Sequence, residues 1–428
     1  MARLPLSSAG ESEAAPPLPH GYRWVVLFGI WLIYASFGMT TVSLAPLVLS
    51  VTNDLGIGHA SMGLVFGAWQ MLFIVCAVPA GALTDKVGVR WSLFLAALMI
   101  ALSGILRSVA PGYWSLFAAV AVCGFGAPLI STGAPKLVAR YFRGQERGFA
   151  MGIYITGPAI GSIIALSSTN ALMMPLFDGN WRRVLLVWAF LALLAGFAWF
   201  AIASQAQVKA ADIAATIAPR QKQRDVIREL WAVPAVQMLL AMSVGIFLFN
   251  HGLNNWLPEI LRDKGMSPAV AGFWATIPTM VGLAGSLIIP RLATPERRYA
   301  MLGGLFVAAM LASVLLRAEQ GFVLMVGLAL QGVARSSMMT VAMLTLVETP
   351  GIGEKRAATA SGMFFTAAEV GGASGPLVMG VIHEASDGFS SCLAFLTTIM
   401  IGLLLASLRL ARIAEASAAA AKSSPPAP

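Results

Sequence analysis

Two charged side chains lie near the middle of long apolar stretches of this 428-residue sequence. Arg335 stands in the stretch 321–347, and Glu369 stands in the stretch 357–383. A lone charge at the centre of a bilayer costs at least about 2.5–3.5 kcal/mol, so such residues usually have a function there. The Arg335 guanidinium offers five donors in a fixed fork that suits a carboxylate, and the Glu369 carboxyl can bind and release a proton.

The pair Arg335 and Glu369 allows two interpretations, and both place the side chains in the interior of a helix bundle. In the first, a proton bound at Glu369 frees Arg335 for an anion, so that proton and anion movements are coupled. In the second, a permanent salt bridge between them only holds two neighbouring helices in register.

A polar segment interrupts the apolar stretch 231–261. Asn250 and Asn254 lie one helical turn apart, with His251 and Asn255 on the adjoining stripe. Four polar side chains at this spacing predict a water-filled cavity and substrate contacts. The alternative is hydrogen bonding that only locks helices together.

Three further side chains are candidates for substrate binding. Gln331 precedes Arg335 by one turn and is expected on the same helix face. Tyr34 and Tyr154 lie within apolar stretches and could line a cavity, although tyrosines in membrane helices often face lipid or the interface.

The composition excludes most other classes of protein. Hydrophobic residues make up 58% of the chain, and charged residues only 11%. A soluble domain has roughly 25% charged residues, so a soluble enzyme, a nucleic-acid-binding protein and a disordered chain are all excluded. The net charge of +9 is explained by Lys and Arg in cytoplasmic loops.

The elements that would carry these residues are membrane-spanning helices, each needing about 20 apolar residues. We predict an all-α polytopic protein with twelve spans, at 24–50, 60–83, 89–108, 113–141, 148–175, 184–204, 231–261, 269–289, 299–316, 321–347, 357–383 and 389–410.

The longest polar connection, 205–230, divides the chain into two predicted six-helix bundles. These bundles cover 24–204 and 231–412, with an N-terminal tail at 1–23 and a disordered C-terminal tail at 413–428. Most of the 28 Lys and Arg residues fall in alternate connections that include 205–230. This bias predicts that both termini and the linker are cytoplasmic.

The connection between the second and third spans has a compact charged motif. It contains Gly81, Asp85, Lys86, Gly88 and Arg90. Gly81 is expected to allow close helix approach, and Gly88 a tight turn. The charges could hold helices together in one state and release them in another, or could simply fix topology in a solvated loop.

This motif resembles the signature loop of the major facilitator superfamily. Tyr141-Phe142-Arg143, followed by Arg147-Gly148, and Asn180-Trp181-Arg182 are similar to further loop motifs of that family. The resemblance implies two pseudo-symmetric bundles that transport a solute by alternating access, with the first, fourth, seventh and tenth helices lining the path. Val120 replaces an arginine that many proton-coupled drug exporters of the family carry, which weakens a drug-antiporter interpretation.

These observations together predict a secondary transporter rather than an enzyme. The expected substrate is a small organic anion such as a carboxylate, and the expected mode of transport is symport with protons as the coupling ion. The alternatives are an amphipathic solute (a drug, haem or siderophore) and, less favoured, Cu(I) held by methionine pairs. We expect no cofactor, no metal site, no nucleic-acid partner, and a monomer in the bilayer of a bacterial inner membrane.

Overall fold

The computed structural model describes residues 21–216, 223–294, 296–349 and 352–423, and every regular element in them is a helix. The first half of the chain contains α1 (Tyr22–Val42), η1 (Ala45–Leu47), α2 (Val48–Leu55), α3 (His59–Ser108), α4 (Tyr113–Tyr141), α5 (Gly144–Ser168), η2 (Thr169–Met173), α6 (Met174–Leu176) and α7 (Trp181–Ala203). The second half contains α10 (Pro234–Asp263), α11 (Pro268–Trp274), α12 (Ile277–Leu292), α13 (Arg298–Leu315), α14 (Phe322–Val347), α15 (Gly353–Ser386) and α16 (Phe389–Ser423).

Eleven helical segments in the described residues are long and apolar enough to cross a membrane, and one of them holds two predicted spans. Helix α3 has 50 residues. A straight helix of that length would measure about 75 Å, far more than a bilayer of about 30 Å. The chain breaks at Gly88, where φ is 83° and ψ is 164°. The tight turn predicted at Gly88 is therefore confirmed, and the described part of the chain contains twelve membrane helices.

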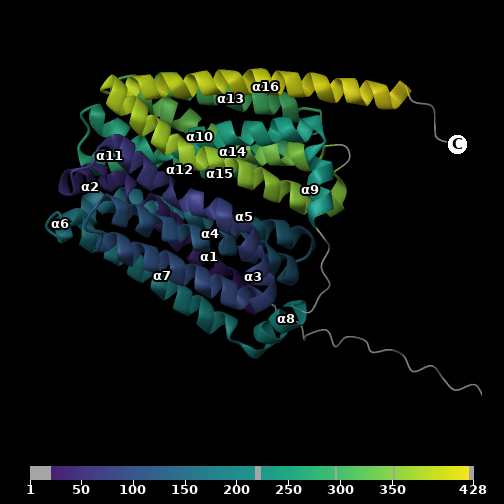
Figure 1. Ribbon diagram of the computed structural model, residues 1–428, viewed down its shortest axis with the longest axis horizontal. Helices are drawn as coiled ribbons and strands as arrows, with labels where there is room; N and C mark the ends of the chain where they lie inside the picture. The colour runs from purple at the N-terminus through teal and green to yellow at the C-terminus, as the bar shows by residue number, and fades with distance from the viewer. Residues whose placement is uncertain (1–20, 217–222, 295, 350–351, 424–428) are drawn as a thin grey trace, which may run out of the picture.

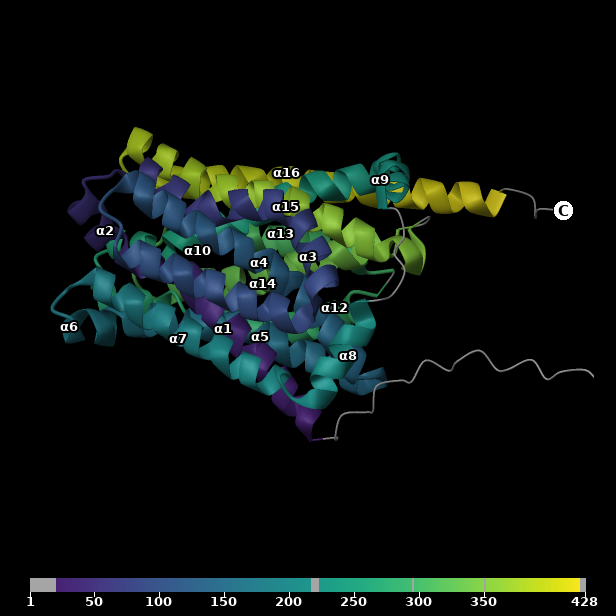
Figure 2. The same cartoon turned by 60° about the horizontal axis from the view of Figure 1, so that its bottom comes forward.

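The helices form two bundles that lie side by side (Figure 1). Helices α1, α3, α4, α5 and α7 form the first bundle, and α10 and α12 to α16 form the second. Linker helices α8 (Ala206–Thr216) and α9 (Gln223–Trp231) lie at one end of the bundles, called the linker end here. Helices α2, α6 and α11 lie at the opposite end, called the α2 end (Figures 1 and 2).

The two bundles contact each other along α3 and α15, near the α2 end. Glycines allow the close approach: a Cβ atom on Gly63 would lie 2.4 Å from the carbonyl oxygen of Pro376, and one on Gly67 would lie 2.3 Å from that of Ala373. Small residues at such crossings let helix backbones pack closely in a membrane.

The C-terminal segment differs from the prediction. We expected a disordered tail at 413–428, but α16 continues to Ser423. The segment is rich in alanine, the best helix former, which explains why it extends the preceding helix. Residues 424–428 and most of the predicted N-terminal tail lie outside the described residues.

Candidate functional site

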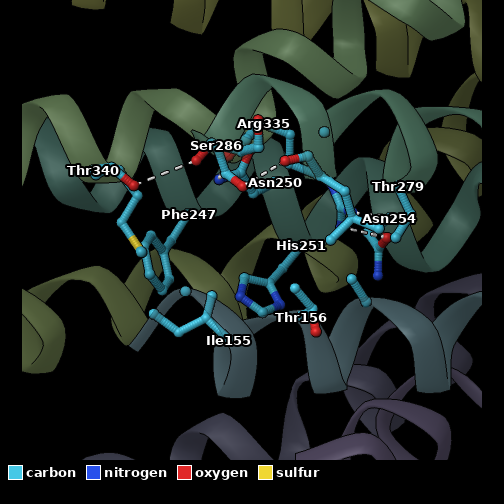
Figure 3. Close-up of a pocket in the computed structure, with 16 residues that line it drawn as sticks. Ile155, Thr156, Phe247, Asn250, His251, Asn254, Thr279, Ser286, Arg335 and Thr340 are labelled. Carbon is cyan, nitrogen blue, oxygen red and sulfur yellow. Dashed lines mark hydrogen bonds between the residues drawn. The ribbon is translucent and has the colours of Figure 1, made fainter. Parts of the chain in front are cut away.

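A cavity of about 420 Å³ lies between the two bundles. Helix α5 of the first bundle contributes one side, and α10, α12 and α14 of the second contribute the rest (Figure 3). The sixteen residues that line it are Gly152, Ile155, Thr156, Ala159, Phe247, Asn250, His251, Asn254, Thr279, Gly282, Leu283, Ser286, Arg335, Ser336, Met339 and Thr340. Arg335 is the one lining residue with a permanent charge, and the lining contains no carboxylate.

The Arg335 side chain is held by neutral partners. One terminal nitrogen donates to Asn254 Oδ1 at 2.8 Å, and the other donates to Thr279 Oγ1 at 2.9 Å (Figure 3). The salt bridges of the described residues include none between Arg335 and Glu369. The structural interpretation of that pair, a permanent salt bridge, therefore does not hold in this conformation.

Three of the four polar residues predicted on the seventh span line the cavity. Asn250 donates weakly to the Arg335 backbone oxygen at 3.4 Å, and Asn254 and His251 face the same space. Asn255 does not: it is buried, and its amide donates to the His251 backbone oxygen at 2.8 Å. His251 and Asn255 share a stripe, yet only His251 of the two lines the cavity, so spacing along a helix does not show where along a stripe the cavity ends.

Three other predicted binding residues lie outside the cavity lining. Gln331 is 1% exposed, and neither polar atom of its amide has a hydrogen-bond partner. The ring centroids of Tyr34 and Tyr154 lie 5.1 Å apart within the first bundle, and the Tyr34 hydroxyl donates to the Ile130 backbone oxygen. Thr156 and Thr279 take part instead, and hydroxyl residues of this kind give little signal in a sequence of apolar helices.

Glu369 lies next to the cavity but does not line it. The residue is 6% exposed, and its Oε2 atom has no hydrogen-bond partner. A Cβ atom on Gly372 would lie 2.8 Å from Glu369 Oε2 and 3.3 Å from His251 Cδ2. His251, which does line the cavity, therefore stands beside Glu369.

The charged motif after the second span forms its contacts within the first bundle and the linker. Asp85 pairs with Lys136 at 2.5 Å, and Arg90 donates to Ser204 Oγ at 2.8 Å while its guanidinium lies 4.4 Å from the Phe200 ring centroid. Lys86 is exposed.

Gly81 does not show the close helix approach that we predicted. A Cβ atom there would come only to 4.0 Å from Thr132 Cγ2, which is an ordinary contact. Close approaches on this helix occur instead at positions such as Gly63 and Gly67, earlier in the sequence.

The sequence matches the Major Facilitator Superfamily over residues 26–376 and 239–428. The chain belongs to this family. The two bundles that the resemblance implied agree with the observed fold. The family match covers most of the chain, so the resemblance first seen in the short loop motifs is confirmed.

Several proteins named as transporters are similar to this chain. The uncharacterized transporter YycB of Bacillus subtilis is 25% identical over 90% of this chain and 94% of its own length. The D-galactonate transporter of Escherichia coli is 24% identical over 63% and 66%, and the 2-nitroimidazole transporter of Escherichia coli is 26% identical over 86% and 90%. Relatives named for galactarate/D-glucarate (Bacillus subtilis) and gallate (Pseudomonas putida) match at 22% and 23% identity, over 91% and 74% of this chain and 91% and 77% of their own lengths. The chain is thus a membrane transporter, and these relatives are transporters rather than enzymes.

A solved transporter structure shares the fold. A bacterial homologue of the human lysosomal transporter Spinster, in an inward-facing and unoccupied conformation, superposes with a TM-score of 0.66. The match covers 92% of this chain and 97% of that one at 16% identity.

Proposed function

We propose that this protein transports a small organic anion together with a proton, by alternating access. The observation that carries the proposal is the environment of Arg335, a cation that faces a cavity whose lining contains no carboxylate. A cation in an apolar membrane protein is costly unless it is compensated. A bound anion would supply the missing charge.

The guanidinium of Arg335 favours a carboxylate among small anions, because its planar fork can bind both oxygens at once. Asn254 and Thr279 fix the orientation of the fork before substrate arrives. The relatives named for D-galactonate, galactarate/D-glucarate and gallate support a carboxylate substrate.

An amphipathic solute is the second candidate. Ile155, Phe247 and Met339 give part of the cavity an apolar lining that could hold such a molecule. The relative named for 2-nitroimidazole supports this alternative. Arg335 then has no assigned role, and for this reason we favour the anion.

We assign the proton to Glu369. A buried carboxylate oxygen without a donor is unfavourable when charged, and protonation removes the charge. An empty carrier would then combine Arg335⁺ with Glu369⁻, and a loaded carrier would combine the Arg335⁺–anion pair with neutral Glu369. Both states have the same net charge around the cavity, which favours one proton per monoanion.

Alternating access would use the contact between α3 and α15. The bundles meet near the α2 end, and opening there would have to separate Gly63 and Gly67 from α15.

We assign the linker end to the cytoplasm of a bacterial inner-membrane protein, because α1 begins and α16 ends at that end (Figure 2) and the linker is rich in basic residues. The protein would act as a monomer, since the cavity is built from one chain.

A transport assay in proteoliposomes tests the coupling. A pH dye in the lumen reports proton entry when D-galactonate, gallate or simple monocarboxylates are added outside. Wild-type protein should acidify the lumen with at least one of them. Glu369→Gln should not, but should still exchange labelled for unlabelled anion. Glu319→Gln, in the exposed connection between α13 and α14, is the matched control. Acidification by Glu369→Gln at the wild-type rate would refute the assignment of the proton.

A further inference from the structure

A hydrogen bond between the two bundles joins Gln70 to the cavity residue His251. Gln70 lies on α3 and is fully buried, and its Nε2 atom lies 3.1 Å from His251 Nδ1 on α10. The rings of Trp69 and Phe247 pack against His251, with centroids at 6.0 Å and 5.4 Å. The imidazole is therefore held in place from both bundles.

Glu369 adjoins this hydrogen bond. A Cβ atom on Gly372 would touch all three side chains, at 2.8 Å from Glu369 Oε2, 3.3 Å from His251 Cδ2 and 3.4 Å from Gln70 Cγ. Two acceptor atoms in this cluster, Gln70 Oε1 and Glu369 Oε2, are buried without a donor. Buried polar atoms are normally hydrogen-bonded, so two such acceptors in one cluster indicate that a proton belongs there.

We propose that Gln70 is a positioning residue that transmits the protonation of Glu369 to His251, and through His251 to the cavity. With Glu369 protonated, its O–H donates to Gln70 Oε1, and Gln70 Nε2 donates to His251 Nδ1. The single ring hydrogen of neutral His251 is then on Nε2.

Loss of the proton reverses the two hydrogen bonds. The Gln70 amide turns by half a rotation, so that Nε2 donates to the Glu369 carboxylate and Oε1 accepts from His251 Nδ1. Water in the cavity takes the hydrogen from His251 Nε2 and supplies one to Nδ1, so the ring stays neutral and the net release is the single proton that leaves Glu369. The tautomer of a cavity residue thus reports the charge of a residue outside the cavity.

The helices around the cluster bring few charged groups to it. We therefore assign the local response to pH to the hydrogen bonds that join Glu369, Gln70 and His251. On α10, His251 adjoins Glu369 at Gly372, and on α14 the charged Arg335 lines the same cavity as His251. Helix α3 contributes the neutral Gln70, and the first charged residue along α16 is Arg409.

The position of Gln70 links the relay to conformation. Gln70 belongs to the first bundle, whereas His251 and Glu369 belong to the second. Separation of α3 from α15 would break the Gln70 contact and leave His251 and Glu369 together. This inference rests on the proposed proton site at Glu369. It adds Gln70 as the residue that transmits the protonation state of Glu369 to His251.

Nitrogen-15 NMR of the histidine rings tests the inference without a substrate. The chain has only four histidines, so a histidine-labelled protein in nanodiscs gives few signals, and His251→Asn identifies the one of interest. Wild-type protein should change from the Nε2–H to the Nδ1–H tautomer as pH rises. Glu369→Gln should remain in one tautomer at every pH.

The decisive variant is Gln70→Met, which keeps the side-chain length but removes both polar atoms. It should lose the pH-dependent tautomer change, whereas Gln237→Met, an exposed glutamine at the start of α10, should keep it. Melting temperatures check that both variants are folded. A wild-type tautomer change in Gln70→Met, or no change in wild-type protein, would overturn the inference. Proton entry in the liposome assay is independent of this result, so a failure of the transport proposal is recognised separately.

Discussion

Arg335 donates to Asn254 Oδ1 at 2.8 Å, so an amide occupies the place that a carboxylate takes in an ordinary buried ion pair. The amide orients the guanidinium without neutralising it. The positive charge therefore remains available to a molecule that enters the cavity.

This relationship predicts the effect of Asn254→Asp. The substitution keeps the size of the side chain but places a carboxylate against Arg335, which neutralises the cavity. The affinity for an anionic substrate should fall by about 100-fold, because a close charge pair would have to be displaced or left repelling the anion. Binding is measured by isothermal titration calorimetry.

Asn254→Ala is the matched control for that variant. It removes the hydrogen bond but adds no charge, so the affinity should fall by only about tenfold, the value of one hydrogen bond to a charged group. Equal losses for the two variants would mean that orientation, and not charge, decides binding.

The contact between α3 and α15 predicts a shift of conformation in Gly67→Val. The added Cβ atom would lie 2.3 Å from the Ala373 carbonyl oxygen, so the helices must separate. Spin labels at Asn53 and Ala385, on a background without the three cysteines, should report a larger distance across the α2 end. Gly304→Val, on α13 where a Cβ atom would meet open space, should leave the distance unchanged. An unchanged distance in Gly67→Val would show that this contact does not hold the bundles together.

The linker helix α8 predicts a stability effect at Asp212. The Asp212 carboxylate accepts from the backbone N–H groups of Val89 and Arg90 at 2.9 Å and 3.1 Å, and it pairs with Arg140 at 3.3 Å. Asp212→Asn should lower the free energy of unfolding by about 1–3 kcal/mol, because a charged acceptor is lost at the start of the helical segment that follows Gly88.

Differential scanning fluorimetry measures this loss as a lower melting temperature. Asp178→Asn, in the exposed turn before α7, is the control and should change the free energy by less than about 0.5 kcal/mol. A similar shift in both variants would indicate that α8 does not stabilise the first bundle through Asp212.

The sequence predicts the helices and the central charge well, because both depend on local signals. Apolar length defines the spans, and a charge such as Arg335 is conspicuous within an apolar stretch. The break at Gly88 is equally local, since a positive φ favours glycine.

The contacts between helices could not be predicted from spacing. Gln331 shares a helix with Arg335 but does not line the cavity, and Thr279 becomes a partner of Arg335 only because α12 packs beside α14. Arg107 shows the same limit: it stands at the end of α3, where a charge is ordinary, yet it is 1% exposed and donates to the Thr40 backbone oxygen at 2.8 Å. Which helix faces which is decided by the tertiary fold.

A thermal-shift screen of the purified protein tests the central claim, anion binding at Arg335, most directly. Carboxylates and lipophilic cations are compared at two pH values, with wild-type protein and Arg335→Gln. We predict that at least one carboxylate raises the melting temperature of the wild type, more strongly at the lower pH because proton and anion bind together, and that Arg335→Gln shows no such shift. Stabilisation by lipophilic cations alone would contradict the proposal.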